Sequence, residues 1–123
     1  AFAVVEGLGD HGCEYMTGGC VIVLGETGLN FGAGMTGGFA FVLDQNNRFQ
    51  DRYNNELVDT HRITGEAMEE YRSFLRGKIQ EYIDLTRSSY AHRLLQNWDG
   101  VVGKFWLVKP KALRLDMLLT ESN

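Results

Sequence analysis

The sequence has 123 residues, of which 44% are hydrophobic, and its formal net charge is −4 with a pI near 5.3. This length favours one domain over two, because each independent domain must bury a core of its own. The acidic balance argues against a dedicated nucleic-acid binder, which needs basic side chains to neutralise phosphates. The sequence contains neither an apolar run of about 18 residues nor a basic leader, so we expect no membrane partner. With only two cysteines, it is predicted to occupy a reducing, cytoplasmic compartment.

Glycine and charge divide the chain into two unlike parts. Eleven of the fifteen glycines lie between Gly7 and Gly38, and the first basic side chain is Arg48. The polar stretch around Arg48 is rich in Asn and Asp, which is typical of an exposed loop. We therefore expect a single domain over residues 1–123, with glycine-rich strands over 1–47, a linker over 48–63, and helices with a short extended tail over 64–123.

The glycine-rich part contains an internal repeat. Residues 16–24 match residues 35–43 at an offset of 19, each copy reading Met-Thr-Gly-Gly followed by a strand-like run of five residues. The interval has no room for the helix of an α/β crossover, and a coil of stacked parallel turns, a β-helix, fits better than a hairpin. Equivalent residues of such a coil stack about 4.8 Å apart. We expect Met16 beside Met35, Cys20 beside Phe39, and Ile22 beside Phe41.

Two glycine pairs mark the corners of this coil. They are Gly18 with Gly19 and Gly37 with Gly38. We expect at least one glycine of each pair to have a positive φ or to meet a neighbouring turn closely, since glycine alone adopts both at little cost.

The second part of the chain is predicted to be helical. Apolar residues spaced by three and four form one stripe over 66–85, with Thr64 as the expected N-cap. A shorter helix should start after Ser88, and Gly100 and Gly103 are placed to end or bend it. The aromatic run 105–108, followed by Pro110, predicts a short extended segment that packs back on the body.

Two stretches, residues 7–12 and 32–37, match the dinucleotide fingerprint G-x-G-x-x-G. The fingerprint needs a helix immediately after the glycines, so that the helix N-terminus faces the pyrophosphate. Here another glycine turn follows the first stretch and a strand-like run follows the second. We interpret both as corners rather than as cofactor-binding sites.

The remaining candidates for chemistry also favour structural roles. Cys13 and Cys20, with His11 nearby, fall short of the four ligands of structural zinc, and Cys20 fills the repeat position of Phe39. No serine, cysteine or paired carboxylate accompanies the other two histidines in the pattern of a triad. We therefore predict no catalytic, cofactor-binding or metal-binding residue. The side chains weighed are Cys13, Cys20, His11, His61, His92 and the helix-start acids Glu66, Glu69 and Glu70.

The glycine block carries a specific resemblance. Residues 7–19 (GLGDHGCEYMTGG) and 28–38 (GLNFGAGMTGG) closely resemble the C-terminal glycine-rich, or GXGXG, domain of glutamate synthase large subunits. The likeness continues through YNNELV at 53–58, NWD at 97–99 and KFWLVKP at 104–110. One departure is Thr86-Arg87-Ser88, where that family often has Thr-Gly-Ser, which bears on the turn between the two helices.

The resemblance implies a fold and a role. The fold would be a right-handed parallel β-helix, mainly β, followed by a C-terminal helical segment. The domain would be a scaffold beside the amidotransferase and synthase domains of a parent enzyme that converts glutamine and 2-oxoglutarate into two glutamates. The family's FMN and iron–sulfur cluster belong to the synthase domain, so we expect no cofactor here. A plastid location is open for a plant or algal parent.

Alternatives remain open at this point. A free-standing β-helix interaction module would share the repeat, and a dinucleotide-dependent oxidoreductase would need a helix after one of the glycine loops. The apolar, uncharged segment 2–5 also predicts that the isolated chain can form a symmetric homodimer through its first turn, because nothing in that segment opposes pairing with another edge.

Overall fold

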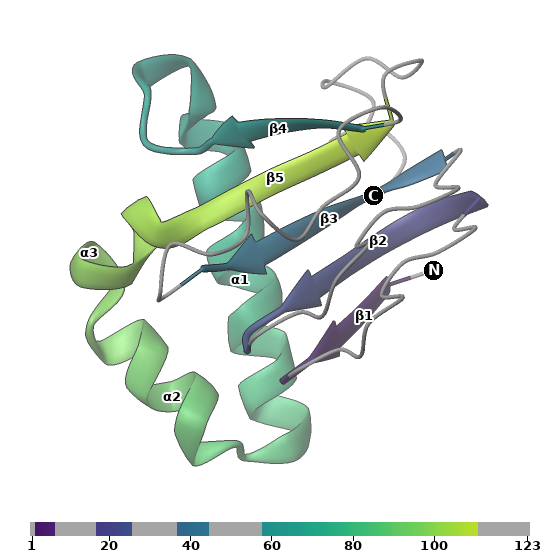
Figure 1. The fold of residues 1–123 in the computed structure, drawn as a ribbon. Coiled ribbons are helices and arrows are strands. Elements are labelled where there is room, and N and C mark those ends of the chain that lie inside the picture. The colour runs from purple at the N-terminus through teal and green to yellow at the C-terminus, as the bar shows by residue number, and fades with distance from the viewer. Residues whose placement is uncertain (1, 7–16, 26–36, 45–57, 111–123) are drawn as a thin grey trace.

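The computed structural model describes residues 2–6, 17–25, 37–44 and 58–110. These residues form one five-stranded sheet in the order β1-β2-β3-β5-β4, with helices packed against one face (Figure 1). The elements in chain order are β1 (Phe2–Val5), β2 (Thr17–Val23), β3 (Gly37–Leu43), β4 (Val58–Arg62), the 3-10 helix η2 (Glu66–Met68), α1 (Glu69–Thr86), α2 (Ser89–Gln96), α3 (Trp98–Val101), the 3-10 helix η3 (Val102–Lys104) and β5 (Phe105–Pro110).

The first three strands are parallel neighbours, as the repeat predicted. Cys20 pairs with Phe39, and Ile22 pairs with Phe41, so the expected register of the repeat is confirmed. Gly19 has a φ of 81° and Gly38 a φ of 78°, so each pair contains one positive-φ glycine as expected. The prediction that the pairs form corners is wrong, because both pairs lie within the strands β2 and β3. The expected stacking of Met16 on Met35 lies outside the described residues.

The predicted right-handed parallel β-helix is wrong. The sheet is mixed and open, because β5 lies between β3 and β4 and runs antiparallel to both. A β-helix would use the free edge of β3 for the next parallel turn, whereas here a strand from the far end of the chain takes that edge. All of the residues of the apolar strand β5 are buried in this position. A sheet that is covered on both faces buries such a strand completely, which a turn of a coil does not need to do. The fold is mixed α/β.

The helices begin and end close to where the apolar stripes placed them. The first one starts as the 3-10 turn η2 and continues as α1, and its start has no side-chain cap, so the prediction of Thr64 as N-cap is wrong. Ser88 does cap α2, because its hydroxyl accepts a hydrogen bond from the backbone N–H of Ala91 at 3.2 Å. The expected extended tail is β5. The sequence did not predict strand β4, since Val58–Arg62 falls inside the stretch interpreted as a linker.

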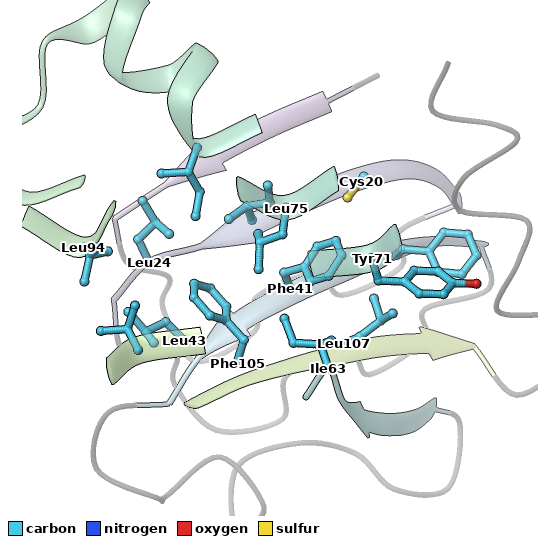
Figure 2. Close-up of a cluster of buried hydrophobic side chains, with 14 of the residues drawn as sticks. Cys20, Leu24, Phe41, Leu43, Ile63, Tyr71, Leu75, Leu94, Phe105 and Leu107 are labelled. Carbon is cyan, nitrogen blue, oxygen red and sulfur yellow. The ribbon is translucent and has the colours of Figure 1, made fainter. Parts of the chain in front are cut away.

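The main core lies between the sheet and the helices α1 and α2. Phe41 and Phe105 supply its aromatic centre from neighbouring strands, with Leu75 of α1 beside them (Figure 2). Leu75 and Ile79 of α1 are fully buried. Phe74 of α1 stacks on Phe41 with ring centroids 6.2 Å apart. Burial of such side chains is the dominant stabilising contribution of the fold. The cluster's remaining buried residues are Cys20, Ile22, Leu24, Phe39, Leu43, Ile63, Tyr71, Ala91, Leu94, Val101 and Leu107.

The opposite face of the sheet is also buried. A second apolar cluster covers that face of the three central strands and of β4, and its members are Val23, Ala40, Val42, Val58, Trp106 and Val108. Strands that are buried on both sides read as continuous apolar runs rather than as alternating ones. This explains why the runs 39–43 and 105–108 contain almost no polar residue.

Candidate functional site

A shared carboxylate ties the end of β1 to the junction of α1 and α2. The Tyr82 hydroxyl donates to Oε2 of Glu6 at 2.5 Å, and the Ser88 hydroxyl donates to the same oxygen at 3.0 Å. The hydrogen bond to Glu6, together with partial burial, raises the pKa of Tyr82. Near it, the Tyr90 hydroxyl donates to the backbone carbonyl of Leu24 after β2. These bonds hold the two N-terminal strands against the helices.

The turn between α1 and α2 contains a residue in the left-handed conformation. Arg87 has a φ of 59° and a ψ of 30°, and its N–H donates to the carbonyl of Ile83 at 2.7 Å, which closes the end of α1. Glycine suits this position, because any Cβ is strained there. The position is the one at which the sequence departs from the Thr-Gly-Ser pattern, so the departure places strain in the backbone of this turn.

A surface hollow of about 480 Å³ lies beside this turn. It combines the guanidinium of Arg87, the imidazole of exposed His92 and the carboxylate of Asp84, so charges of both signs border it. Polar groups of this kind can contact a protein surface or a small polar molecule without selecting one. The residues lining it are Ile83, Asp84, Arg87, Ser88, Ser89 and His92.

A second polar group lies where β4 pairs with β5. Lys109 is only 8% exposed, and its ammonium donates to Oδ2 of Asp59 at 3.2 Å and to the carbonyl of Pro110 at 3.3 Å. On the same face, Nε2 of His61 is buried with no hydrogen-bond partner in the described part of the chain. Burial, and then the charge of Lys109, lower the pKa of His61, while Asp59 acts in the opposite direction.

On the other face of these two strands, Trp106 connects three elements. The guanidinium of Arg62 lies 3.7 Å from the centre of the Trp106 ring, which is a close cation–π contact. The indole N–H of Trp106 donates to Oδ2 of buried Asp44 at 3.2 Å, and Arg62 also donates to the carbonyl of Gly103 at 3.0 Å. These contacts fix β4 and the end of β3 on β5.

A smaller hollow of about 240 Å³ lies between α1 and β1. Leu85, at 86% exposure, is the one large hydrophobic side chain that is exposed among the described residues. Lys78 and Glu81 form an ion pair of 3.2 Å at the rim. The lining residues are Val4, Lys78, Glu81, Tyr82 and Leu85.

The structure separates the residues that sequence analysis weighed as candidates for chemistry. Cys20 is 2% exposed in the main core, which confirms its interpretation as a small buried hydrophobe. His61 is on β4 and His92 is on α2, while His11 and Cys13 lie outside the described residues. Within residues 2–6, 17–25, 37–44 and 58–110, no three His, Cys, Asp or Glu side chains gather as metal ligands.

The acidic residues at the start of the first helix also lie where expected. Glu69 and Glu70 occupy the first turn of α1, and Glu66 begins η2. Acidic side chains at a helix N-terminus interact favourably with its dipole.

The second glycine fingerprint leads directly into β3, which begins at Gly37. A strand in this place is incompatible with the helix that a dinucleotide site needs at that fingerprint.

Sequence analysis missed the bonding role of Glu6 and the exposure of Leu85. No local pattern marks Glu6, because its partners come from residues 82 and 88. A signal did exist for Arg87, since it stands in a turn where the resembling family often has glycine. Leu85 ends the predicted range 66–85 and received no role from the sequence, and the structure leaves its side chain exposed.

None of the helices in the described ranges is both long enough and apolar enough to cross a bilayer.

The family model for the GXGXG motif matches residues 1–111. The chain, whose described residues form the mixed sheet and its one-sided helix layer, therefore belongs to the GXGXG motif family. The resemblance to glutamate synthases is confirmed by relatives of that name. The chain is 47% identical over 112 residues to "Ferredoxin-dependent glutamate synthase" of Pyropia yezoensis, a match that covers 91% of the chain and 7% of the relative.

Two further relatives extend the comparison. "Glutamate synthase [NADH]" of Schizosaccharomyces pombe is 48% identical over 114 residues, which cover 93% of the chain and 5% of the relative. "Ferredoxin-dependent glutamate synthase 2, chloroplastic" of Arabidopsis thaliana is 44% identical over 112 residues, which cover 91% and 7%. The chain thus spans only 5% to 7% of the length of these relatives.

Proposed function

We propose that the chain acts as a scaffold domain of a glutamate synthase and takes no part in the chemistry of that enzyme. The parent would convert glutamine and 2-oxoglutarate into two glutamates. The observation that carries the proposal is that proteins named glutamate synthase match the chain at 42% to 48% identity over 91% to 96% of its length. The chain corresponds to a small part of each, which fits one module of a multidomain polypeptide.

The contacts of the described residues support a scaffold. The carboxylates of Glu6 and Asp44 are engaged in joining strands to helices or to one another, through Tyr82, Ser88 and Trp106. Both faces of the sheet are buried, so the domain has a body that can hold neighbours at fixed positions. The neighbours in the proposal are the amidotransferase and synthase domains of the same polypeptide.

The proposal places the FMN and the iron–sulfur cluster of the parent outside this chain. Cluster ligands are cysteine thiolates that reach the iron. Cys20 instead lies inside the hydrophobic core and is 2% exposed, where it packs as a small hydrophobic side chain. We propose a cytoplasmic parent or, in a plant or alga, a plastid one, since some relatives are named chloroplastic.

A first experiment tests the absence of chemistry. The purified chain is assayed for glutamine hydrolysis, for glutamate formation with a chemical reductant, and for flavin absorbance. We expect no turnover above a buffer control and no flavin. Turnover that scales with protein concentration would show that the chain carries chemistry of its own.

A second experiment tests the scaffold itself, with a chimera in which this chain replaces the matching segment of the ferredoxin-dependent glutamate synthase 2 of Synechocystis sp., to which it is 44% identical over 110 residues. We expect the chimera to form glutamate. Exposed variants such as Arg87→Ala and His92→Ala should leave the turnover rate within about twofold, while the core variant Phe105→Ala should lower the yield of folded enzyme. A fall in turnover by roughly two orders of magnitude in an exposed variant that stays folded would contradict a passive scaffold.

We also propose that the isolated chain forms a symmetric dimer through β1, as its apolar segment suggests. The strand lies at an end of the sheet order. Unpaired backbone groups of an edge strand favour pairing with another strand.

A further inference from the structure

We infer that the C-terminal end of α1 is part of the same self-association surface, and that Leu85 of one copy packs into the hollow between α1 and β1 of a second copy. This inference rests on the proposed dimer through β1 and adds a contact made by helix α1 to that dimer. The surface is defined by β1 with Lys78, Glu81, Tyr82 and Leu85.

The course of α1 brings its last turns to the β1 side of the sheet. Near its start, Arg72 donates to the carbonyl of Ile63, which follows β4, at 2.7 Å. Near its end, Tyr82 donates to Glu6, which follows β1. The helix therefore crosses the sheet from one edge strand to the other (Figure 1). A strand added beside β1 would lie next to this end of α1.

The chemistry of this end of α1 is unlike that of an ordinary exposed helix face. Leu85 is 86% exposed, and the hollow beside it is bordered by Val4 and Tyr82. An exposed leucine next to an apolar recess forms a projection and a cavity on one surface. Two copies related by a twofold axis can each place the projection in the cavity of the other, which is the geometry of an isologous contact.

The charges at the rim favour a second copy over a strongly charged partner. Lys78 and Glu81 contribute one charge of each sign to the hollow. A twofold axis can set the lysine of one copy toward the glutamate of the other, so the rim is self-complementary. A partner of one dominant charge, such as an anionic membrane surface, would meet a like charge at this rim.

The orientation of the paired strands agrees with this arrangement. Two β1 strands that are related by a twofold axis perpendicular to the sheet run antiparallel. Such a pair is joined by direct hydrogen bonds between the two backbones. Both α1 helices then lie on the same face of the ten-stranded product, with their C-terminal ends facing each other. Leu85 and Val4 of the two copies come together over the new strand pair.

Sedimentation velocity on the purified chain over a range of concentrations tests the inference. The variants are Leu85→Lys, which changes an exposed side chain, Val4→Lys on β1, and Ser73→Lys as a control that adds the same charge elsewhere on the exposed surface of α1. Circular dichroism verifies that each is folded. We expect a dimer whose dissociation constant rises at least tenfold with Leu85→Lys and is unchanged with Ser73→Lys.

The possible results separate the proposals. A dimer that Val4→Lys disrupts and Leu85→Lys does not would leave the β1 contact in place and overturn the role of Leu85. A monomer at all concentrations, or open-ended oligomers that are indifferent to Leu85→Lys, would overturn this inference. If Val4→Lys fails to fold, amide exchange of β1 replaces it, and exchange that does not slow with concentration would overturn the strand contact. None of these results bears on the scaffold role, which the chimera tests separately.

Discussion

The glycine-rich half and the helical half of this domain are held together by different kinds of interaction. In the first half, β1, β2 and β3 are consecutive parallel strands, and a positive-φ glycine lies within β2 and within β3. In the second half, β4 and β5 are antiparallel neighbours, and every helix in the described ranges lies between them in the sequence. Local spacing specifies the first arrangement, whereas burial of an apolar stripe and of β5 specifies the second.

Within the sheet, the two halves meet in the pair of β3 and β5, and this makes each dependent on the other. Leu43 pairs with Phe105, and Phe41 pairs with Leu107, so β5 completes the edge of the glycine-rich half. It also pairs with β4 on its other side. The comparison shows that a local repeat can fix the register of strands without fixing the fold, because a distant strand decides what lies next in the sheet.

The most severe test of this dependence is Phe105→Ala. Phe105 is fully buried in the main core and lies 5.9 Å from Trp98, centroid to centroid. Removing its ring leaves a cavity at the junction of the halves and should lower the free energy of unfolding by about 3–5 kcal/mol. The measurement is urea denaturation, with Ser73→Ala at an exposed position of α1 as the control, which should change stability by about 0.5 kcal/mol or less. Similar midpoints for the two variants would mean that β5 does not join the halves.

The glycine-rich half is tested by Gly19→Ala and Gly38→Ala. Their φ values of 81° and 78° strain any residue with a Cβ, so each variant should lose about 1 kcal/mol or more. The matched control is Gly77→Ala within α1, where an added Cβ meets nothing within 4 Å. Alanine there should stabilise the protein by about 0.5–1 kcal/mol, since glycine weakens a helix interior. If all three variants melt alike, the backbone at Gly19 and Gly38 does not depend on glycine.

The sequence predicted the structural features that depend on residues close together in the chain. It did not predict those that depend on contacts between distant residues. The repeat specified the parallel register of Cys20 with Phe39, and the stripe specified α1, because both patterns are written into neighbouring residues. It did not reveal β4, or that β5 would take the edge of β3, since strand pairing between segments so far apart in the chain leaves no periodic signal. The β-helix prediction failed for that reason.

The same reasoning applies to the candidate surface. The interpretation of Cys20 needed only the internal repeat, and that of the helix-start acids needed only neighbouring residues. The structure agrees with both. The bonds of Glu6 to Tyr82 and Ser88 bridge 76 and 82 residues, so the sequence alone contained no sign of them.

The turn that joins the helices offers a smaller, opposite effect. Arg87→Gly removes the strain of a side chain at a φ of 59° and should stabilise the domain by about 1 kcal/mol. Arg76→Gly removes an exposed arginine from the middle of α1 and should destabilise by about 1 kcal/mol, which controls for loss of the guanidinium. Thermal denaturation distinguishes them by sign. A destabilised Arg87→Gly would mean that the arginine side chain makes a compensating contact in this turn.

The smallest expected effect concerns the pH dependence of the helical half. Burial and Lys109 hold the pKa of His61 below its usual 6.5 in the folded protein. The unfolded chain therefore binds the proton more readily, so the contribution of His61 to stability is complete above pH 6.5 and declines as the pH falls toward its folded pKa. His61→Gln should make this part of the stability profile flatter, because glutamine does not titrate.

The stability profile is measured as the urea midpoint from about pH 7.5 down to about pH 5. The control is His92→Gln, at an exposed position of α2. Carboxylates titrate in every variant at the lower end, so the difference between the two glutamine variants isolates His61. A second variant, Lys109→Met, removes one of the influences that depress the pKa of His61, and it should make the decline of the profile shallower, since the folded pKa then lies closer to that of the unfolded chain. Because Lys109 also bonds Asp59 at 3.2 Å, its variant is compared with itself across pH rather than with the wild type at one pH. A profile of His61→Gln that runs parallel to that of His92→Gln would show that the unpaired Nε2 atom does not couple the β4–β5 pair to protonation.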